Sequence, residues 1–357
     1  MMQLSDHTHI GVQRKRAGYG FWQTSFRKLQ GMSHKKSDNL VGLDIGSTAI
    51  TMVQLTPCGQ SVSLERFGVQ QVPVIADPAK SRQQPDRLKH AIQELIRTCD
   101  IQQKYVAVSL SGASVIIKRI ELPPMRVEEV EGYLTWEGSR HLPFDMDEVY
   151  WDNHPILTQG PQASGHEVRS AFVFAAKRKT VEDLQNVVLE AGLRPVVCDV
   201  NVVALSNMYV MTHPITPDGL VLLVNIADHH LNMCVMNQKQ VVWMRDAPIR
   251  CPQYEEALPQ AQLVVDEIIG EVKRTMEYLA ADESSQLIQK VIFYGNLREQ
   301  HNLQIRVQED LGLTTECGNP FLGIKIDSLP SWNQTDRDLA SFAAIGVGLA
   351  GRKRGDR

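Results

Sequence analysis

The chain has 357 residues, of which 43% are hydrophobic, so it is long enough for two core-bearing domains or one large bilobed domain. Its formal net charge of −4 gives no general signal for nucleic-acid binding. The six cysteines include no CxxC pair, which favours reduced thiols in a cytoplasmic compartment over a disulfide framework or a zinc site. No apolar run approaches the roughly 20 residues that span a bilayer, and no signal peptide precedes the first predicted strand. Any membrane role is therefore expected to come through a partner or a surface contact.

Residues 1–38 are predicted to form an extension outside the fold. They carry seven Lys or Arg residues against Asp6 and Asp38, a charge of roughly +5 that leaves about −9 for the remainder. Basic and aromatic residues are mixed in the stretch RKRAGYGFWQTSFRKLQ, which suits a membrane interface or a partner groove. A flexible tail without such a role is the alternative, and translation could also begin at Met32.

The segment Leu40 to Met52, LVGLDIGSTAITM, predicts a short apolar strand, a turn and a second strand. Gly46 lacks a Cβ and lets the backbone pass close to a ligand. The N–H groups of the turn, with the hydroxyls of Ser47 and Thr48, would form a concave anion site. Asp44, at the end of the strand, could hold Mg²⁺ through its water shell. The segment predicts a phosphate and Mg²⁺ held by a β-hairpin, with an ordinary glycine turn as the alternative.

Helices and strands then alternate through the middle of the chain. Apolar residues at helical spacing predict a helix that begins at Pro85 and Asp86 and reaches Cys99. A strand pair, KYVAVSL and SVIIKRIEL, is expected to follow, joined by residues 111–113 and stopped by Pro123-Pro124. Next come a helix from about Val127 that Pro143 ends, the strand SAFVFAAKR, and a helix with Thr180 as its N-cap and Gly192 as its stop.

The second half repeats the layout of the first. From Leu220 the chain reads LVLLVNIADHHLNMCVMNQKQVVWMRDAPI, which predicts three strands with tight polar turns between them. A helix at 262–279, the strand VIFYGN, a further helix and the closing stretch DLASFAAIGVGLAGRKR follow. Such a duplication predicts two halves that face a shared nucleotide site. His229 and His230 are neighbours on a strand and point to opposite faces, so they predict no metal site.

Several motifs occur in the order typical of one family. They are GLDIGSTAITMVQL, AVSLSGASVIIKRIELPPM, EGSRHLPFDMDEVYWDNHPIL, AAKRKTVEDLQNVVLEAGLRPVVCDV, the NPF at Pro320, and FAAIGVGLAGR. From Leu40 to Arg352 the chain resembles the PilM family, the actin-like cytoplasmic proteins of type IV pilus assembly. The resemblance implies an α/β, actin-like (ribonuclease H-like duplicated) bilobed fold with the 1C subdomain of FtsA and PilM.

The resemblance also implies a division into domains. Residues 39–218 would form domain 1, which is subdomain 1A with the 1C insertion at about 105–192. Residues 219–335 would form domain 2, with subdomains 2A and 2B. Residues 336–357 would form a closing helix that packs back on the core.

ATP and Mg²⁺ are the cofactors that the resemblance implies, at three loops that are unequally preserved. The first loop matches at Asp44, Gly46, Ser47 and Thr48, with Asp44 as the Mg²⁺ residue. The second loop normally reads Asp-Ile-Gly. Here it reads Asn225-Ile226-Ala227. Asn225 replaces a carboxylate by an amide, and Ala227 adds a methyl group beside the expected phosphate.

The third loop, for adenosine, is normally a Gly-Gly pair and here reads Gly295-Asn296. Lys273 and Arg274 on the preceding helix would flank the adenine and ribose, or else lie on a solvated surface. These changes predict weak ATP binding and hydrolysis that is slow or absent, and no catalytic residue is assigned.

The resemblance implies an adaptor role. Proteins of this family lie under the inner membrane and bind the cytoplasmic N-terminal peptide of PilN in a groove between subdomains 1A and 1C. They thereby link the inner-membrane alignment complex to the pilus motor, with the motor ATPases and the platform protein as further candidate partners. A ridge of residues is our candidate for the groove, with core packing as the alternative: Leu134, His141, Leu142 and Phe144.

Three other functions stay open. A small-molecule kinase or ATPase of the actin superfamily would keep the Asp and Gly of the second loop, and this chain has lost both. A filament former like FtsA would end in an amphipathic membrane helix, whereas this chain ends in GRKRGDR. A paralogous adaptor of another secretion system, such as type II secretion, is the third.

Overall fold

The computed structural model describes most of the chain beyond the N-terminal extension. The described residues are 39–46, 48–59, 61–72, 84–157, 167–214, 219–227, 229–249, 258–281, 287–295, 300–326 and 334–356. The predicted extension 1–38 lies outside the described residues. Of the predicted site, Ser47 and Asn296 also lie outside them.

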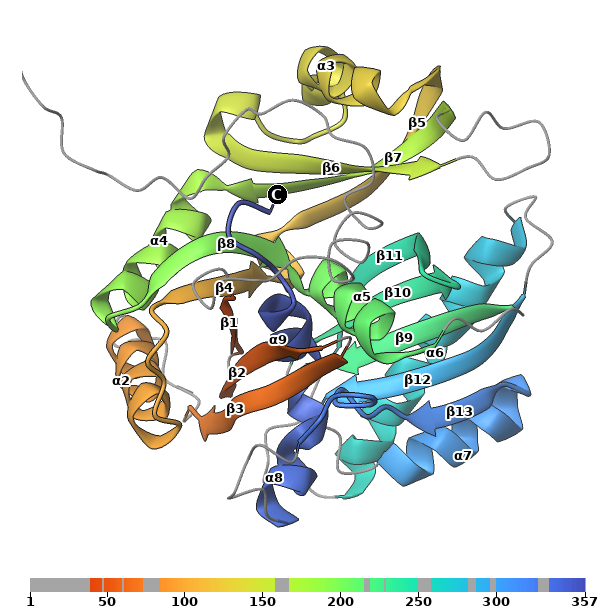
Figure 1. The fold of residues 1–357 in the computed structure, drawn as a ribbon. Coiled ribbons are helices and arrows are strands. Elements are labelled where there is room, and N and C mark those ends of the chain that lie inside the picture. Colours follow the sequence, from red (N-terminus) through yellow and green to blue (C-terminus); the bar gives the residue numbers. More distant parts are fainter. Residues whose placement is uncertain are drawn as a thin grey trace, which may run out of the picture.

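Two five-stranded sheets with the same topology form the body of the described structure (Figure 1). The first, in the order β3-β2-β1-β4-β8, consists of β1 (Val41–Ile45), β2 (Ala49–Cys58), β3 (Ser61–Gln71), β4 (Tyr105–Leu110) and β8 (Arg194–Val200). The second, in the order β11-β10-β9-β12-β13, consists of β9 (Leu220–Ile226), β10 (His230–Asn237), β11 (Gln240–Pro248), β12 (Ile288–Gly295) and β13 (Thr314–Cys317). Each sheet is an antiparallel meander of three strands extended by two parallel strands. The predicted internal duplication is confirmed.

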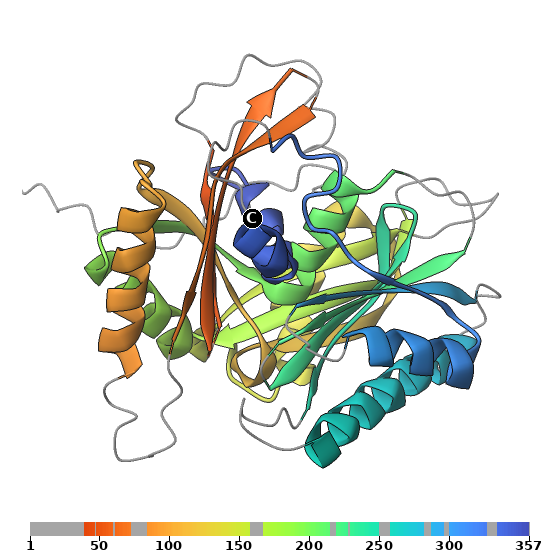
Figure 2. The ribbon, with the colours of Figure 1, turned by 90° about the horizontal axis from the view of Figure 1, so that it is seen from below.

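Helices separate and cover the two sheets, as Figure 2 shows from below. On the outer face of the first sheet lie α2 (Gln84–Thr98) and α4 (Arg178–Glu190), and on that of the second lie α6 (Leu258–Ala281) and α7 (Gln300–Leu311). Between the sheets pack α5 (Asn201–Thr212) and α9 (Ala344–Ala350), and α8 (Gln334–Leu339) precedes α9. Because both sheets cover it, α5 is buried on nearly every side rather than on one face only, and its buried residues include Asn201, Ser206 and Thr212.

Glycines let α9 approach its neighbours closely. A Cβ on Gly42 of β1 would lie 2.0 Å from the Gly346 carbonyl oxygen of α9, and a Cβ on Gly348 would lie 1.8 Å from the Ala204 carbonyl oxygen of α5. Neither contact is possible for a residue with a side chain, so these glycines set the spacing of the central layer.

A third sheet forms a separate subdomain, which we call the inserted subdomain. It pairs β5 (Ile116–Arg126), β7 (Glu167–Lys177) and β6 (Val149–Leu157) in that order, and α3 (Val127–Glu137) packs on one face. In the second half α7 follows β12 directly, whereas in the first half this subdomain intervenes between β4 and α4. The insertion is therefore narrower than the predicted 105–192, because β4 and α4 belong to the first sheet and its helical layer.

Three local predictions were wrong. KYVAVSL and SVIIKRIEL do not pair, because β4 is a central strand between β1 and β8 while β5 belongs to the inserted subdomain. Pro123-Pro124 does not stop β5, an edge strand that continues with an irregular register to Arg126. Helix α4 begins at Arg178, not after Thr180.

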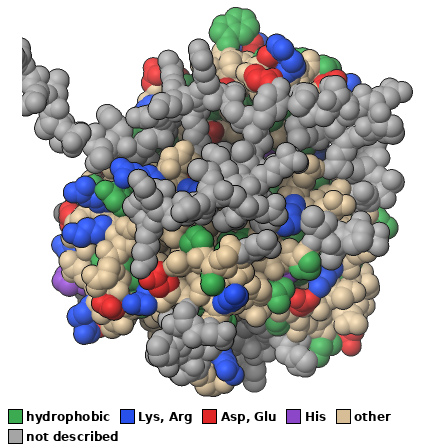
Figure 3. All heavy atoms as spheres, in the orientation of Figure 1, with side chains coloured by type: hydrophobic (Ala, Val, Ile, Leu, Met, Phe, Trp, Pro, Cys, Tyr) green, Lys and Arg blue, Asp and Glu red, His purple; other side chains and the backbone are tan. Residues whose placement is uncertain are grey.

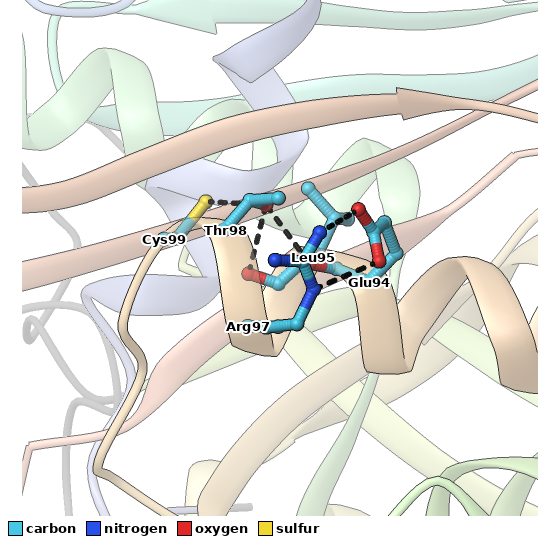
Figure 4. Close-up of polar contacts among 5 residues, drawn as sticks. All are labelled: Glu94, Leu95, Arg97, Thr98 and Cys99. Atoms are coloured by element: carbon cyan, nitrogen blue, oxygen red, sulfur yellow. Dashed lines mark hydrogen bonds and ion pairs between the residues drawn. The ribbon is translucent and has the colours of Figure 1, made fainter.

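The end of α2 shows how a helix is anchored to a strand (Figure 4). Arg97 Nε donates to Glu94 Oε2 at 3.2 Å, and Thr98 Oγ1 donates to the Glu94 carbonyl at 2.9 Å. Cys99 Sγ contacts the Phe67 carbonyl oxygen of β3 at 3.5 Å. A Cβ on Gly68 would lie 2.3 Å from that sulfur, so Gly68 makes room for the helix end.

The described surface is mixed in charge. On the face drawn in Figure 3, Lys and Arg side chains are interspersed with Asp and Glu. Among the described helices, none combines the length and apolarity that crossing a membrane requires.

Candidate functional site

The two predicted phosphate hairpins close with the same backbone turn. Gly46 N donates to the Ala49 carbonyl oxygen at 2.9 Å between β1 and β2. Ala227 N donates to the His230 carbonyl oxygen at 3.0 Å between β9 and β10. Ala227 therefore occupies in the second half the position that Gly46 occupies in the first, and its methyl group lies at the turn.

The strand register extends this correspondence to the polar residues. Asp44 at the end of β1 lies opposite Thr51 of β2. Asn225 of β9 lies opposite Asn232 of β10, which in turn lies opposite Asp246 of β11. The second sheet thus presents a row of three polar residues where the first presents one carboxylate and one hydroxyl.

A chain of hydrogen bonds connects this row. Asn225 Nδ2 donates to Asn232 Oδ1 at 3.0 Å, and Asn232 Nδ2 donates to Asp246 Oδ1 at 2.8 Å. Asn201, at the start of α5, directs its Nδ2 at Asn232 Oδ1 from 3.5 Å. Asn225 is 6% exposed and Asn232 is fully buried. The amide that replaces the expected carboxylate at 225 is therefore held inside the protein by its neighbours.

The chain of hydrogen bonds ends on the first half of the molecule. Asp246 Oδ2 accepts the backbone N–H of Gly112 at 2.7 Å. His230 Nε2 and Ser111 Oγ lie 2.7 Å apart. Burial raises the pKa of the Asp246 carboxyl, while the hydrogen bonds from Asn232 and Gly112 and the charge of His230 oppose that rise.

Gly295 of the third predicted loop has a structural role of its own. Its φ is +89°, and a Cβ there would lie 2.2 Å from the Ile226 carbonyl oxygen of β9. Glycine is therefore required by the pairing of β12 with β9, whatever ligand approaches.

Lys273 and Arg274 are both exposed on α6. Arg274 Nη1 donates to Glu271 Oε1 at 2.8 Å, and Arg245 of β11 lies 3.5 Å from the second oxygen of the same carboxylate. The Glu271 side chain is only 7% exposed. Arg274 is thus engaged in an ion-pair cluster that ties α6 to β11, and Lys273 lies on the surface beside it.

Half of the predicted partner ridge is core. Leu134 and Leu142 are 1% and 6% exposed and pack between α3 and the inserted sheet, so they are not available to a partner. The helix ends at Glu137 and not at the predicted Pro143, so His141 lies beyond it. His141 and Phe144 are half-buried, with Lys118 Nζ bonded to the His141 carbonyl at 2.9 Å and Lys177 Nζ 4.9 Å from the centre of the Phe144 ring.

The donors at the first hairpin fit the phosphates and Mg²⁺ of a nucleotide only in part. Asp44 and Thr48 are half-buried at the turn, which suits water-mediated metal binding and a hydroxyl contact. The second hairpin contributes an amide rather than a carboxylate. Within the described ranges, no three or more His, Cys, Asp or Glu side chains converge as a metal site.

Sequence reasoning missed Asn232, Asp246 and Asn201. Asn232 follows Asn225 by seven residues, as Thr51 follows Asp44, so the duplication contained a signal for it. Asp246 was the one acid in the strand QVVWMRDAP. Its contact with Gly112 joins residues 134 positions apart, which no local pattern reports.

Comparison with known proteins supplies the family. The family model of type IV pilus assembly protein PilM matches residues 42–261. Over 87% of this chain and 97% of the other, the fold is similar to a structure described as the PilM-PilN type IV pilus biogenesis complex, with a TM-score of 0.73 and 22% identity.

Two further structures are more distant. One is a Bacteroides thetaiotaomicron protein with an actin-like ATPase fold and unknown function (TM-score 0.46, 11% identity, 83% of this chain and 97% of the other). Another is the ethanolamine utilization protein EutJ from Carboxydothermus hydrogenoformans (TM-score 0.45, 11% identity, 93% and 99%). The duplicated sheets and the inserted subdomain confirm the predicted actin-like fold. With a family match that covers more than half of its length, this chain belongs to the PilM family of type IV pilus assembly proteins.

Proposed function

We propose that this chain is a cytoplasmic adaptor that binds the N-terminal peptide of a PilN protein at the inner-membrane face. The observations that support this most are the match to the PilM family model and the similarity across 87% of the chain to a structure described as the PilM-PilN type IV pilus biogenesis complex. Membrane association would then come through PilN. Contacts with the pilus motor ATPases and the platform protein would connect the adaptor to the motor.

The peptide would lie between the inserted subdomain and the first sheet, as the family resemblance implies. His141 and Phe144 stay candidates for its edge, because both are half-buried beyond the end of α3. An extended peptide would order on binding, which costs free energy and favours affinities near the micromolar range.

We further propose that ATP with Mg²⁺ binds weakly at the first hairpin. Gly46, Ser47 and Thr48 would hold the phosphates, and Asp44 would hold Mg²⁺ through water, where the metal would offset phosphate charge. Gly295, Asn296, Lys273 and Arg274 would lie on the adenosine side.

The second hairpin would limit both affinity and turnover. Asn225 already donates to Asn232, and Ala227 replaces a glycine at the turn. One lost charge-assisted contact weakens binding by roughly tenfold or more. We therefore propose hydrolysis that is slow or absent, in line with a nucleotide-binding scaffold rather than a kinase.

Calorimetric titration tests both proposals. A synthetic PilN peptide is expected to bind the full chain, whereas a scrambled peptide of the same composition should not. Asp44→Asn should weaken binding of Mg·ATP by about tenfold, and Asp183→Asn, the same change on the exposed surface of α4, should leave it unchanged. A turnover on the order of 1–100 s⁻¹ would instead support a kinase-type enzyme.

A further inference from the structure

The linker that leads into the inserted subdomain is held by the opposite half of the molecule. Ser111 and Gly112 connect β4 of the first sheet to β5 of the inserted sheet, through the short helix η2 (Gly112–Ser114). His230 and Asp246, which contact them, belong to β10 and β11 of the second sheet. We call these four residues the linker clasp.

The backbone conformation of Gly112 and its contact with His230 support the clasp in addition to the hydrogen bonds. Gly112 has φ +59°, a left-handed conformation that favours glycine. A Cβ on Gly112 would lie 3.5 Å from His230 Nδ1, so the imidazole packs directly against the linker backbone. β11 contacts both η2 and β5. The second sheet therefore fixes the conformation of the linker from which the inserted subdomain extends.

The clasp is also continuous with the second phosphate hairpin. From Gly112 N–H the hydrogen bonds pass to Asp246, to Asn232 and then to Asn225. Each of these bonds is 3.0 Å or shorter. The two asparagines are buried, and Asp246 and Gly112 are half-buried. A connected network of this kind has few alternative arrangements, so a change at one end alters the other.

We propose that the linker clasp couples the second hairpin to the orientation of the inserted subdomain. Phosphate near Asn225 and Ala227 competes for the Asn225 amide and repels the Asp246 carboxylate, because both carry negative charge. Release of Gly112 then frees the inserted subdomain, the part that carries the proposed peptide edge. This inference rests on the proposed function for its ligand, but the clasp itself is testable without nucleotide.

Hydrogen exchange of the full chain, measured by mass spectrometry, tests the clasp through the exchange rates of the linker amides. Ser111→Ala removes the Ser111–His230 contact and keeps the Gly112–Asp246 bond, whereas His230→Ala also removes the imidazole that packs against Gly112. If the contacts act together, exchange of the amides at 111–116 rises about tenfold or more in both variants. His229→Ala, at the exposed residue immediately before β10, should leave that exchange unchanged, and the amides of α5 should stay protected in every variant.

The ligand arm uses Mg·ATP on the wild-type chain at a concentration that saturates it in calorimetry. Exchange at 111–116 is expected to rise with nucleotide, and to rise much less in Ser111→Ala, where the linker amides already exchange faster. Unchanged linker exchange in both alanine variants, or an increase spread evenly over the molecule, would overturn the clasp. ATP that binds without changing linker exchange would overturn the coupling and leave the proposed function standing. If ATP does not bind at all, the nucleotide proposal fails with the coupling, and the variants alone decide whether the clasp exists.

Discussion

Replacing Gly348 by alanine tests whether close contact between α9 and α5 holds the two halves together. The new Cβ would lie 1.8 Å from the Ala204 carbonyl oxygen, and this atom belongs to the helix backbone, so it cannot rotate away. Helices α9 and α5 would have to separate by about 1 Å or more to reach an ordinary contact. The same shift would disturb the Gly42–Gly346 contact on the other side of α9.

The expected change in the free energy of unfolding is the difference between two opposing effects. Alanine in a helix gains about 1 kcal/mol over glycine, and overpacking a core costs about 1–3 kcal/mol, sometimes more. Because α9 is wedged between α5 and β1, we expect the upper end of that range and a net loss of about 2 kcal/mol in the free energy of unfolding. Gly132→Ala in α3 is the matched control, since nothing lies within 4 Å of its new Cβ.

Urea unfolding of both variants, followed by circular dichroism, measures the two effects with the same chemical change. Gly132→Ala should be more stable than the parent by about 0.5–1 kcal/mol, and Gly348→Ala clearly less stable. If Gly348→Ala matched Gly132→Ala in stability, the close packing described for the central layer would be wrong.

Three further predictions concern buried groups. His154 is half-buried in β6, and burial lowers its pKa to about 4. The stability that its neutral form contributes is complete above pH 6.5 and is lost as pH falls, and on the order of 1–2 kcal/mol should be lost by pH 5. Urea titrations of His154→Gln should lack that part of the acid sensitivity. Thiol alkylation should modify exposed Cys58 rapidly and Cys234 only on unfolding, since Cys234 is fully buried and burial raises the pKa of its thiol; equal rates would contradict the described burial. Arg352 Nε lies 3.4 Å from Asp199 Oδ2, and both side chains are 7% exposed. Arg352→Met should therefore lower the free energy of unfolding by about 3 kcal/mol, and adding Asp199→Asn to it should recover part of that loss. Additive losses in the double variant would mean that the pair is not coupled.

Much of the fold could be predicted because its signal is local and occurs twice. An apolar strand, a small-residue turn and an alternating strand appear at Leu40 and again at Leu220, and the two sheets have the same strand order. The predicted helix ending at Cys99 corresponds to α2, and the turn at Asn237-Gln238-Lys239 connects β10 to β11. Periodicity carries this information without any knowledge of tertiary contacts.

Strand partners could not be predicted in the same way. The chain KYVAVSL-SGAS-VIIKRIEL reads as a hairpin because two strand patterns flank a glycine turn. In the structure β4 has β1 and β8 as neighbours, and the left-handed Gly112 redirects the chain into another sheet. Leu134 was a candidate for the partner ridge because spacing alone does not say which apolar stripe is covered.

At the site, sequence reasoning identified positions but not their hydrogen-bond partners. The substitution of Asn225 for a carboxylate was visible, and so was Ala227. What the amide bonds to depends on Asn232 and Asp246, which come close only through strand pairing. Asn225 in the hairpin and Asp246 on β11 are therefore parts of one hydrogen-bond network, although they look unrelated in the sequence.

We propose above all that the chain is an adaptor whose peptide binding responds to nucleotide. The most direct measurement is a fluorescence titration of a PilN N-terminal peptide into the purified full chain, with and without Mg·ATP. We predict micromolar affinity for the peptide and a several-fold change in that affinity when ATP is present, as expected for coupled sites. A peptide that binds equally with and without ATP would reduce the protein to a scaffold with a decayed site, and a peptide that does not bind at all would contradict the adaptor function.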